Sequence, residues 1–107
     1  TPIVMKTSSG ALTNMKIVEV SNLRNAIDRL KELNYWVIGT DADGTNYTNI
    51  DYKGKVALVI GSEGNGLKEI VRRSCDVIAS IPLKGKVNSL NASVAAGIMI
   101  YEVVKSR

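Results

Sequence analysis

The chain has 107 residues, 45% of them apolar and 22% charged, which predicts one small folded domain with a real core and argues against disorder. Its 14 Lys and Arg against 10 Asp and Glu give a formal charge of +4, a mild basic excess that suits a polyanionic partner. The absence of histidine and the single cysteine, Cys75, exclude a metal site of these side chains, a Cys/His nucleophile pair and a disulfide framework.

The first part of the chain predicts a strand, a helix and a second strand. Residues 16–20 form the first strand, and Ser21 or Asn22 is placed to cap the helix that follows. Apolar residues then recur at three- and four-residue intervals, which is typical of a helix with one packed face. They are Leu23, Ala26, Ile27, Leu30 and Leu33. Asn34 suits a left-handed helix terminator before a strand over residues 35–39.

The remainder predicts two more strands, two helices and one long loop. Residues 56–60 and 77–81 are mainly apolar and β-branched, as in central parallel strands covered on both faces. Helices are expected over residues 67–73 and 88–104, the second with one apolar face. That face is formed by Leu90, Val94, Ile98 and Tyr101. Residues 41–54 are expected to be a surface loop. The order of elements predicts an α/β fold with a parallel sheet.

The strongest local feature is the glycine-rich segment 61–67 (GSEGNGL), at the carboxyl end of one expected strand and before a helix. Ligands bind at this edge of α/β sheets, and glycines let the backbone approach a ligand closely. A tight turn without a ligand remains an alternative. Its Glu63 is either a solvated turn residue or a polar group directed at the site. The glycine spacing fits neither of the familiar nucleotide motifs.

A second feature, residues 81–97, joins a strand end to a helix through a basic, glycine-containing loop. Asn88, Ser89 and Asn91 are all residue types that cap helices, so a structural role is favoured over a catalytic one for any of them alone. Capping does not explain the small side chains that follow, which allow a backbone or a ligand to come close. These are Ala92, Ser93, Ala95, Ala96 and Gly97.

Three other features could suggest a function, but each also has an ordinary structural explanation. Lys84 and Lys86 are either contacts to RNA phosphates or solvated surface charges. Asp41 and Asp43 suggest a calcium loop only superficially, because the glycine stands at the fourth rather than the sixth position of the motif, and we reject that interpretation. Cys75 is expected to be a small buried residue and not a reactive thiol. No apolar run is long enough to span a membrane, so we expect a protein of the reducing cytoplasm.

Taken together and in this order, residues 61–67 and 81–96 resemble the second and third motifs of the SpoU/TrmH family of RNA 2′-O-methyltransferases. The resemblance extends upstream through residues 8–11 (SSGA) and the strand ending at residues 37–39 (VIG), so it covers essentially the whole chain. It is closest to members that modify large-subunit ribosomal RNA, although enzymes of transfer RNA share these motifs.

The resemblance implies a SPOUT-type α/β fold with a C-terminal trefoil knot, which periodicity alone would not suggest. It implies a homodimer that binds S-adenosylmethionine in the knot, with the active site near the subunit interface, no metal and no membrane. Carried onto this chain, Gly61, Ile81 and Leu90 contact the cofactor, largely through main-chain groups. Thr40 and Leu83 lie near it.

Glu63, Ser89 and Asn91 match the polar active-site positions of the family. The family's first motif, an Asn and an Arg that precede the SSGA region, has no counterpart in residues 1–107. That Arg is the residue thought to activate the hydroxyl. The resemblance therefore implies that residues 1–107 are the C-terminal portion, truncated at the N-terminus, of a cofactor-binding methyltransferase domain.

The leading hypothesis is methyl transfer from S-adenosylmethionine to a ribose 2′-hydroxyl of structured RNA, with ribosomal RNA favoured over transfer RNA. A non-catalytic, knotted RNA-binding or assembly module is the alternative, and the intact Glu63, Ser89 and Asn91 argue against it. A third hypothesis is an unrelated α/β protein that binds a nucleotide or another anion at residues 61–67.

Overall fold

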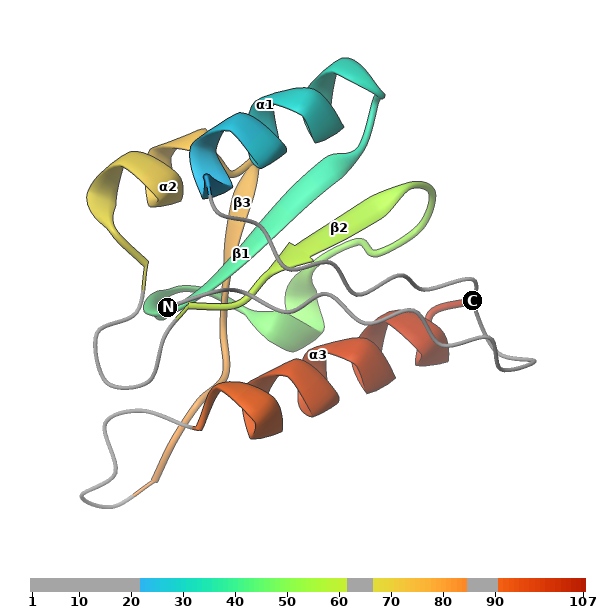
Figure 1. The fold of residues 1–107 in the computed structure, drawn as a ribbon. Coiled ribbons are helices and arrows are strands. Elements are labelled where there is room, and N and C mark those ends of the chain that lie inside the picture. The colour runs from blue at the N-terminus through green and yellow to red at the C-terminus, as the bar shows by residue number, and fades with distance from the viewer. Residues whose placement is uncertain (1–21, 62–66, 85–90) are drawn as a thin grey trace.

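Three parallel strands form a sheet that is covered by helices on both faces (Figure 1). The computed structural model describes residues 22–61, 67–84 and 91–107. The strands, in the spatial order β2-β1-β3, are β1 (Trp36–Asn46), β2 (Val56–Val59) and β3 (Val77–Ser80). The helices are α1 (Leu23–Glu32), α2 (Glu69–Ser74) and α3 (Ala92–Lys105). The expected α/β class with a parallel sheet is confirmed, while the strand expected at residues 16–20 lies outside the described residues.

Helix α1 forms where its sequence predicts, except that Leu33, expected on its packed face, is the C-cap and is 42% exposed. Asn22 is the N-cap, and its side-chain oxygen accepts a hydrogen bond from the Asn25 amide at 3.0 Å. Ile27, on the face of the helix that packs against the sheet, is fully buried. Asn34 has φ 67°, which confirms the left-handed terminator before β1.

The middle strand, β1, divides the core into two layers. Val37 packs with Ile27 of α1 and Val71 of α2 on one face, in a cluster of buried apolar residues. Its neighbour Ile38 belongs to the cluster on the opposite face, with Met99 of α3. Successive strand residues point to opposite faces, so a strand buried on both sides must be apolar at consecutive positions.

Helix α3 is present where a helix was expected, but it does not pack through the expected apolar face. Val94 and Tyr101 are 51% and 68% exposed. The buried residues of the helix are instead Met99, Glu102 and Val103, and the small Ala95 and Ala96 also pack against the core. Small side chains let the helix backbone approach the sheet, and a count of apolar residues by periodicity underestimates such a face.

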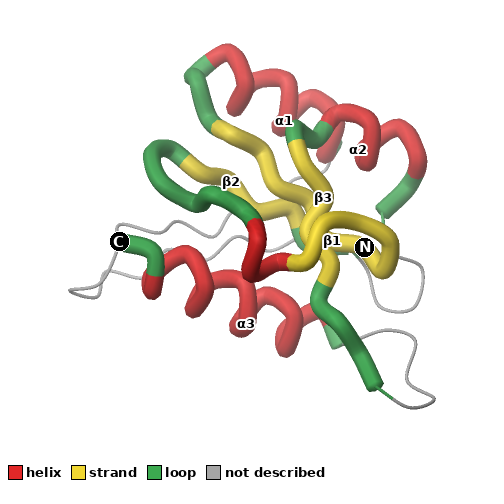
Figure 2. The backbone as a smooth tube through the Cα atoms, turned by 180° about the vertical axis from the view of Figure 1, so that it is seen from behind, coloured by secondary structure: helices red, strands yellow, loops and turns green. Residues whose placement is uncertain are grey.

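Residues 41–54 are not one irregular loop, as was expected. Strand β1 runs on to Asn46, and both Thr40 and Thr45 pair with Ala79, so residues 41–44 form an excursion that leaves the strand and returns (Figure 2). Asn46 then caps a 3-10 helix, η1 (Tyr47–Asn49), by accepting a hydrogen bond from the Thr48 amide at 3.0 Å. The periodicity of the sequence misses β1 beyond Thr40 because the excursion interrupts it.

The excursion presses against β3 at Gly44. A Cβ atom at this position would lie 2.6 Å from the carbonyl oxygen of Ile78 and 2.8 Å from its Cγ2. Only glycine allows this approach without displacing the backbone of β3.

Tyr52 fastens the segment after η1 to the core beside α3. Its side chain is 1% exposed, and its hydroxyl donates a hydrogen bond to the carbonyl oxygen of Tyr47. Burial, with a smaller contribution from the negative charge of Glu102, raises the pKa of Tyr52 to about 12.

We expect Tyr52→Phe to lower the free energy of unfolding by about 1 to 2 kcal/mol, because it leaves the part-buried carbonyl of Tyr47 without its donor. Tyr35→Phe is the matched control: its ring lies 4.7 Å from the Lys55 ammonium, and phenylalanine retains this contact, so a change within about 0.5 kcal/mol is expected. Urea unfolding measures both. Equal effects of the two substitutions would show that the hydroxyl of Tyr52 does not stabilise the fold.

The two substitutions, Tyr52→Phe and Tyr35→Phe, should also differ in how the free energy of unfolding depends on pH above 10. The unfolded chain ionises Tyr52 near its ordinary pKa of 10, whereas the folded chain holds the proton to about 12. The stabilisation is therefore complete below pH 10 and is lost as pH rises toward 12. This part of the alkaline loss of stability should be absent in Tyr52→Phe and present in Tyr35→Phe.

Candidate functional site at the carboxyl edge of the sheet

Parallel pairing brings the carboxyl ends of the three strands to one edge, where α/β sheets bind ligands. Thr40 pairs with Ala79 of β3, and its hydroxyl donates a long hydrogen bond of 3.4 Å to the carbonyl of Val59 in β2. Gly61 lies two residues beyond Val59, and Ile81 two beyond Ala79. The structure thus brings three of the five expected cofactor residues, Thr40, Gly61 and Ile81, to the same edge.

The segment after β3 presents both apolar side chains and main-chain groups at this edge. Residues 81–84 belong to no helix or strand, and Ile81 and Leu83 are half-buried. Ile81 also packs against the core cluster beside α3. Half-buried apolar side chains next to an irregular backbone can pack against a planar heterocycle such as adenine, while main-chain groups bind its polar edge. The residues present therefore fit the adenosine part of S-adenosylmethionine.

The polar site residues expected from the sequence are only partly within the described chain. Glu63 and Ser89 lie outside it, as does Leu90, which was expected to contact the cofactor. Asn91 is the N-cap of α3, where its side-chain oxygen accepts hydrogen bonds from the amides of Ser93 at 2.8 Å and Val94 at 3.4 Å. The capping role is confirmed, and a role of Asn91 toward a substrate stays a prediction.

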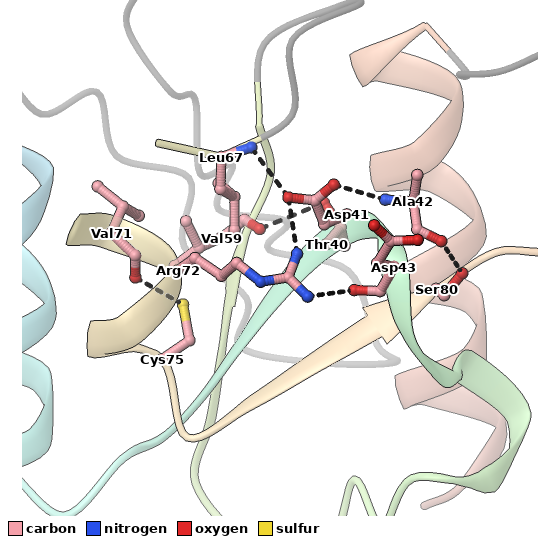
Figure 3. Close-up of polar contacts among 10 residues, drawn as sticks. All are labelled: Thr40, Asp41, Ala42, Asp43, Val59, Leu67, Val71, Arg72, Cys75 and Ser80. Atoms are coloured by element: carbon pink, nitrogen blue, oxygen red, sulfur yellow. Dashed lines mark hydrogen bonds and ion pairs between the residues drawn. The ribbon is translucent and has the colours of Figure 1, made fainter. Parts of the chain in front are cut away.

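Sequence reasoning missed a polar network that ties β1 to α2 and β3 at this edge (Figure 3). A carboxylate oxygen of Asp41 lies 3.0 Å from Nη1 of Arg72, and Nη2 of Arg72 donates to the carbonyl of Asp43 at 2.6 Å. The hydroxyl of Ser80 donates to the carbonyl of Ala42 at 2.9 Å. No local motif links residues so far apart in the chain. The only signal is a run of polar residues directly after a strand end.

This network also bears on the rejected calcium loop. The Asp41 carboxylate already pairs with the guanidinium of Arg72, whose positive charge would repel a metal cation. Among the described residues, no three Asp, Glu or Cys side chains cluster as a metal site.

The end of the glycine-rich segment, Leu67, is held from two sides. Its amide donates a hydrogen bond of 3.4 Å to the Asp41 carboxylate. Its side chain lies over Gly39, where a Cβ atom would be 2.7 Å from Cδ1 of Leu67 and 2.8 Å from Sγ of Cys75. A side chain at residue 39 would therefore displace the end of the Leu67 side chain from this position.

Part of the basic excess caps helices at the opposite edge. The Lys31 ammonium donates to the carbonyl of Ser74 at the end of α2 at 2.9 Å, and that of Lys55 to the carbonyl of Leu33 at the end of α1 at 2.7 Å. Cations at helix C-termini satisfy carbonyls that lack partners within the helix. Lys84 is exposed just after β3 and so stands at the carboxyl edge, while Lys86 lies outside the described residues.

Comparison with known proteins gives a consistent picture. The sequence model of the SpoU rRNA Methylase family matches residues 1–101. A Staphylococcus saprophyticus protein assigned to the TrmH family of tRNA/rRNA methyltransferases is 45% identical over 108 residues, which cover 100% of this chain and 43% of that protein. The chain thus spans less than half the length of this relative.

Two solved structures share the fold. The A. aeolicus TrmH/SpoU tRNA modifying enzyme superposes with a TM-score of 0.75 at 30% identity, over 82% of this chain and 46% of its own. The SpoU methyltransferase AviRb of Streptomyces viridochromogenes, in complex with the cofactor AdoMet, superposes with a TM-score of 0.73 at 32% identity, over 82% of this chain and 36% of its own. None of the described helices here is long and apolar enough to cross a membrane.

Cys75 is a half-buried residue at the C-terminal end of α2, where it packs in the same cluster as Leu67, and it is not placed as a nucleophile. Burial, and to a smaller extent the negative charge of Asp76, raises the pKa of its thiol from 9 to about 11. At pH 8 the folded protein then holds about a hundredfold less thiolate than the unfolded chain. We expect iodoacetamide to alkylate Cys75 about a hundredfold more slowly in the folded protein than in urea. A small-molecule thiol under both conditions corrects for the effect of urea, and equal corrected rates would contradict the packed position.

Proposed function

The chain belongs to the SpoU rRNA Methylase family of RNA methyltransferases, and we propose that it forms the S-adenosylmethionine-binding part of such an enzyme. The observation that carries the proposal is the convergence of Thr40, Gly61 and Ile81 at the carboxyl edge of a parallel sheet. A related structure of the same fold, AviRb, was solved with this cofactor. Under this proposal, residues 1–107 are the cofactor-binding portion of a methyltransferase domain, and the whole protein methylates RNA.

At this edge, Ile81 and Leu83 would pack against the adenine ring. Leu90, which lies outside the described residues, is proposed as a further cofactor contact. The main chain at Gly61 would approach the ribose or the methionine part, since glycine leaves room there. Thr40 closes the site from the middle strand. When bound, the cofactor supplies a methyl group on a positively charged sulfur, which is a strong electrophile.

We assign the methyl acceptor as a ribose 2′-hydroxyl, with ribosomal RNA favoured over transfer RNA. Glu63, Ser89 and Asn91 are proposed to orient the hydroxyl, because in-line placement of two reacting groups can supply much of the rate. The N-cap formed by Asn91 fixes the start of α3. Lys84, exposed at the same edge, is placed to meet an RNA phosphate.

The knot and the homodimer belong to the same proposal. We propose that the segment after β3 and helix α3 form the trefoil knot of the family. The face of α3 that carries Val94 and Tyr101 is apolar and exposed, and it would contact a second copy of the chain. We also propose that the protein acts in the cytoplasm, without a metal.

Cofactor binding is tested by titrating the full-length protein with S-adenosylhomocysteine in a calorimeter. Leu83→Arg should weaken binding by at least about tenfold, because it places a cation and extra volume where the ring would lie. Leu33→Arg is the matched control, since this exposed leucine lies at the opposite edge of the sheet. If Leu83→Arg binds S-adenosylhomocysteine as tightly as the wild type does, the cofactor does not bind at this edge.

The acceptor is tested by its chemistry. The full-length protein is incubated with labelled S-adenosylmethionine and with ribosomal or transfer RNA, and the labelled RNA is hydrolysed with alkali. Alkaline cleavage uses the 2′-hydroxyl as the nucleophile, so 2′-O-methylation should leave the label in a dinucleotide that resists hydrolysis. Label in mononucleotides would show base methylation instead. RNA binding without cofactor uptake would favour the non-catalytic assembly module.

A further inference from the structure

We propose that Asp41 and Arg72 are positioning residues that set the affinity for S-adenosylmethionine by holding Leu67, and that they do so without contacting the cofactor. The inference rests on the proposed function, because it needs the cofactor to bind beside the segment that Leu67 ends. Neither residue belongs to the motifs at 61–67 and 81–96, and only the folded structure brings them together.

The Asp41 carboxylate is a junction between strand β1 and helix α2. Its Oδ2 lies 3.0 Å from Nη1 of Arg72 and accepts the Leu67 amide at 3.4 Å, while its Oδ1 accepts the Ala42 amide at 2.7 Å. The side chains of Asp41 and Arg72 are only 20% and 29% exposed. An ion pair with this burial is screened less by solvent than a surface pair, and its geometry is fixed by further hydrogen bonds.

Arg72 extends the junction to the excursion of β1. Its Nη2 donates to the carbonyl of Asp43 at 2.6 Å, so one guanidinium contacts both a carboxylate and a main-chain oxygen (Figure 3). On the other side, Ser80 of β3 donates to the carbonyl of Ala42. The excursion is thus tied to α2 and to β3 at once, directly after Thr40.

Leu67 is the point at which this network acts on the site. Gly61 continues from β2 at one end of the glycine-rich segment, and Leu67 closes the other end through its amide on Asp41 and its side chain over Gly39. A residue that is held in place before binding loses less conformational entropy when a ligand binds beside it. Loss of the Asp41 or Arg72 contact should therefore weaken binding and leave the reacting groups unchanged.

The chain provides a matched control in the neighbouring arginine. Arg73 lies on the same helix and makes an ion pair with Glu69, with 3.0 Å between Nε and Oε1. Both side chains are largely exposed, at 78% and 68%, and the ion pair lies within α2. Arg72→Met and Arg73→Met make the same chemical change at adjacent positions, one inside the network and one outside it.

The test is made on the full-length protein, with S-adenosylhomocysteine as the probe. We expect Arg72→Met and Asp41→Ala to raise Kd about tenfold, and Arg73→Met to change it less than about twofold. Asp41→Asn keeps an acceptor for the Leu67 amide and should recover part of the affinity. With RNA as the second substrate, KM for S-adenosylmethionine should rise while kcat at saturating cofactor stays near the wild-type value.

Three outcomes would overturn the inference. If the wild type binds S-adenosylhomocysteine and both Arg72→Met and Asp41→Ala bind it with the same Kd, this inference is wrong and the proposed function still stands. If Arg73→Met raises Kd as much as Arg72→Met does, the effect comes from the loss of positive charge on α2 and not from the contact with Asp41. A wild type that binds no S-adenosylhomocysteine would remove the proposed function as well. If Arg72→Met does not fold, Arg72→Lys, which keeps the charge but loses the two-pronged contact, is judged by the same rise in Kd.

Discussion

The parallel pairing of β1 with both of its neighbours is the constraint on which the rest of the structure depends. Because both pairings are parallel, the segments that follow β2 and β3 leave the sheet at the edge where Thr40 lies. The chain between parallel strands must return over a face of the sheet, and α2 does so after the glycine-rich segment. A site that combines the ends of all three strands follows from this topology, whichever ligand occupies it.

The charged residues divide between the two edges of the sheet. At the amino edge, Lys31 and Lys55 cap the ends of α2 and α1, so their charge stabilises the scaffold. At the carboxyl edge, Asp41 and Arg72 form a part-buried pair that joins separate elements. The exposed pairs within helices contribute little by comparison, since solvent and salt screen them. They include Arg24–Asp28, Arg29–Glu32 and Arg73–Glu69. Counting charges therefore says less about this protein than where each charge is held.

Local signals in the sequence predict most helices and strands, but they do not predict the contacts between residues far apart in the chain. The cap at Asn22, the apolar stripe of α1 and the terminator Asn34 each act within a few residues, so α1 could be placed from the sequence alone. The excursion of β1 depends on Gly44 meeting the backbone of β3, and the packed face of α3 depends on how closely its alanines approach the sheet. Both are properties of tertiary packing. The site followed the same division: the edge could be predicted from the glycine-rich segment, while the Asp41–Arg72 pair could not.

A site of this kind suits a chain with little reactive chemistry of its own. The sequence has no histidine, and the thiol of Cys75 is held in its protonated form by burial. Under the proposed function, the methyl donor is already a strong electrophile, and the task that remains for residues 1–107 is to bind and orient it. Orientation needs fixed strand ends, capped helix starts and a glycine-rich segment held at both ends. Under the same proposal, the placement of Leu67 by Asp41 and Arg72 contributes to binding of the methyl donor without a reacting side chain.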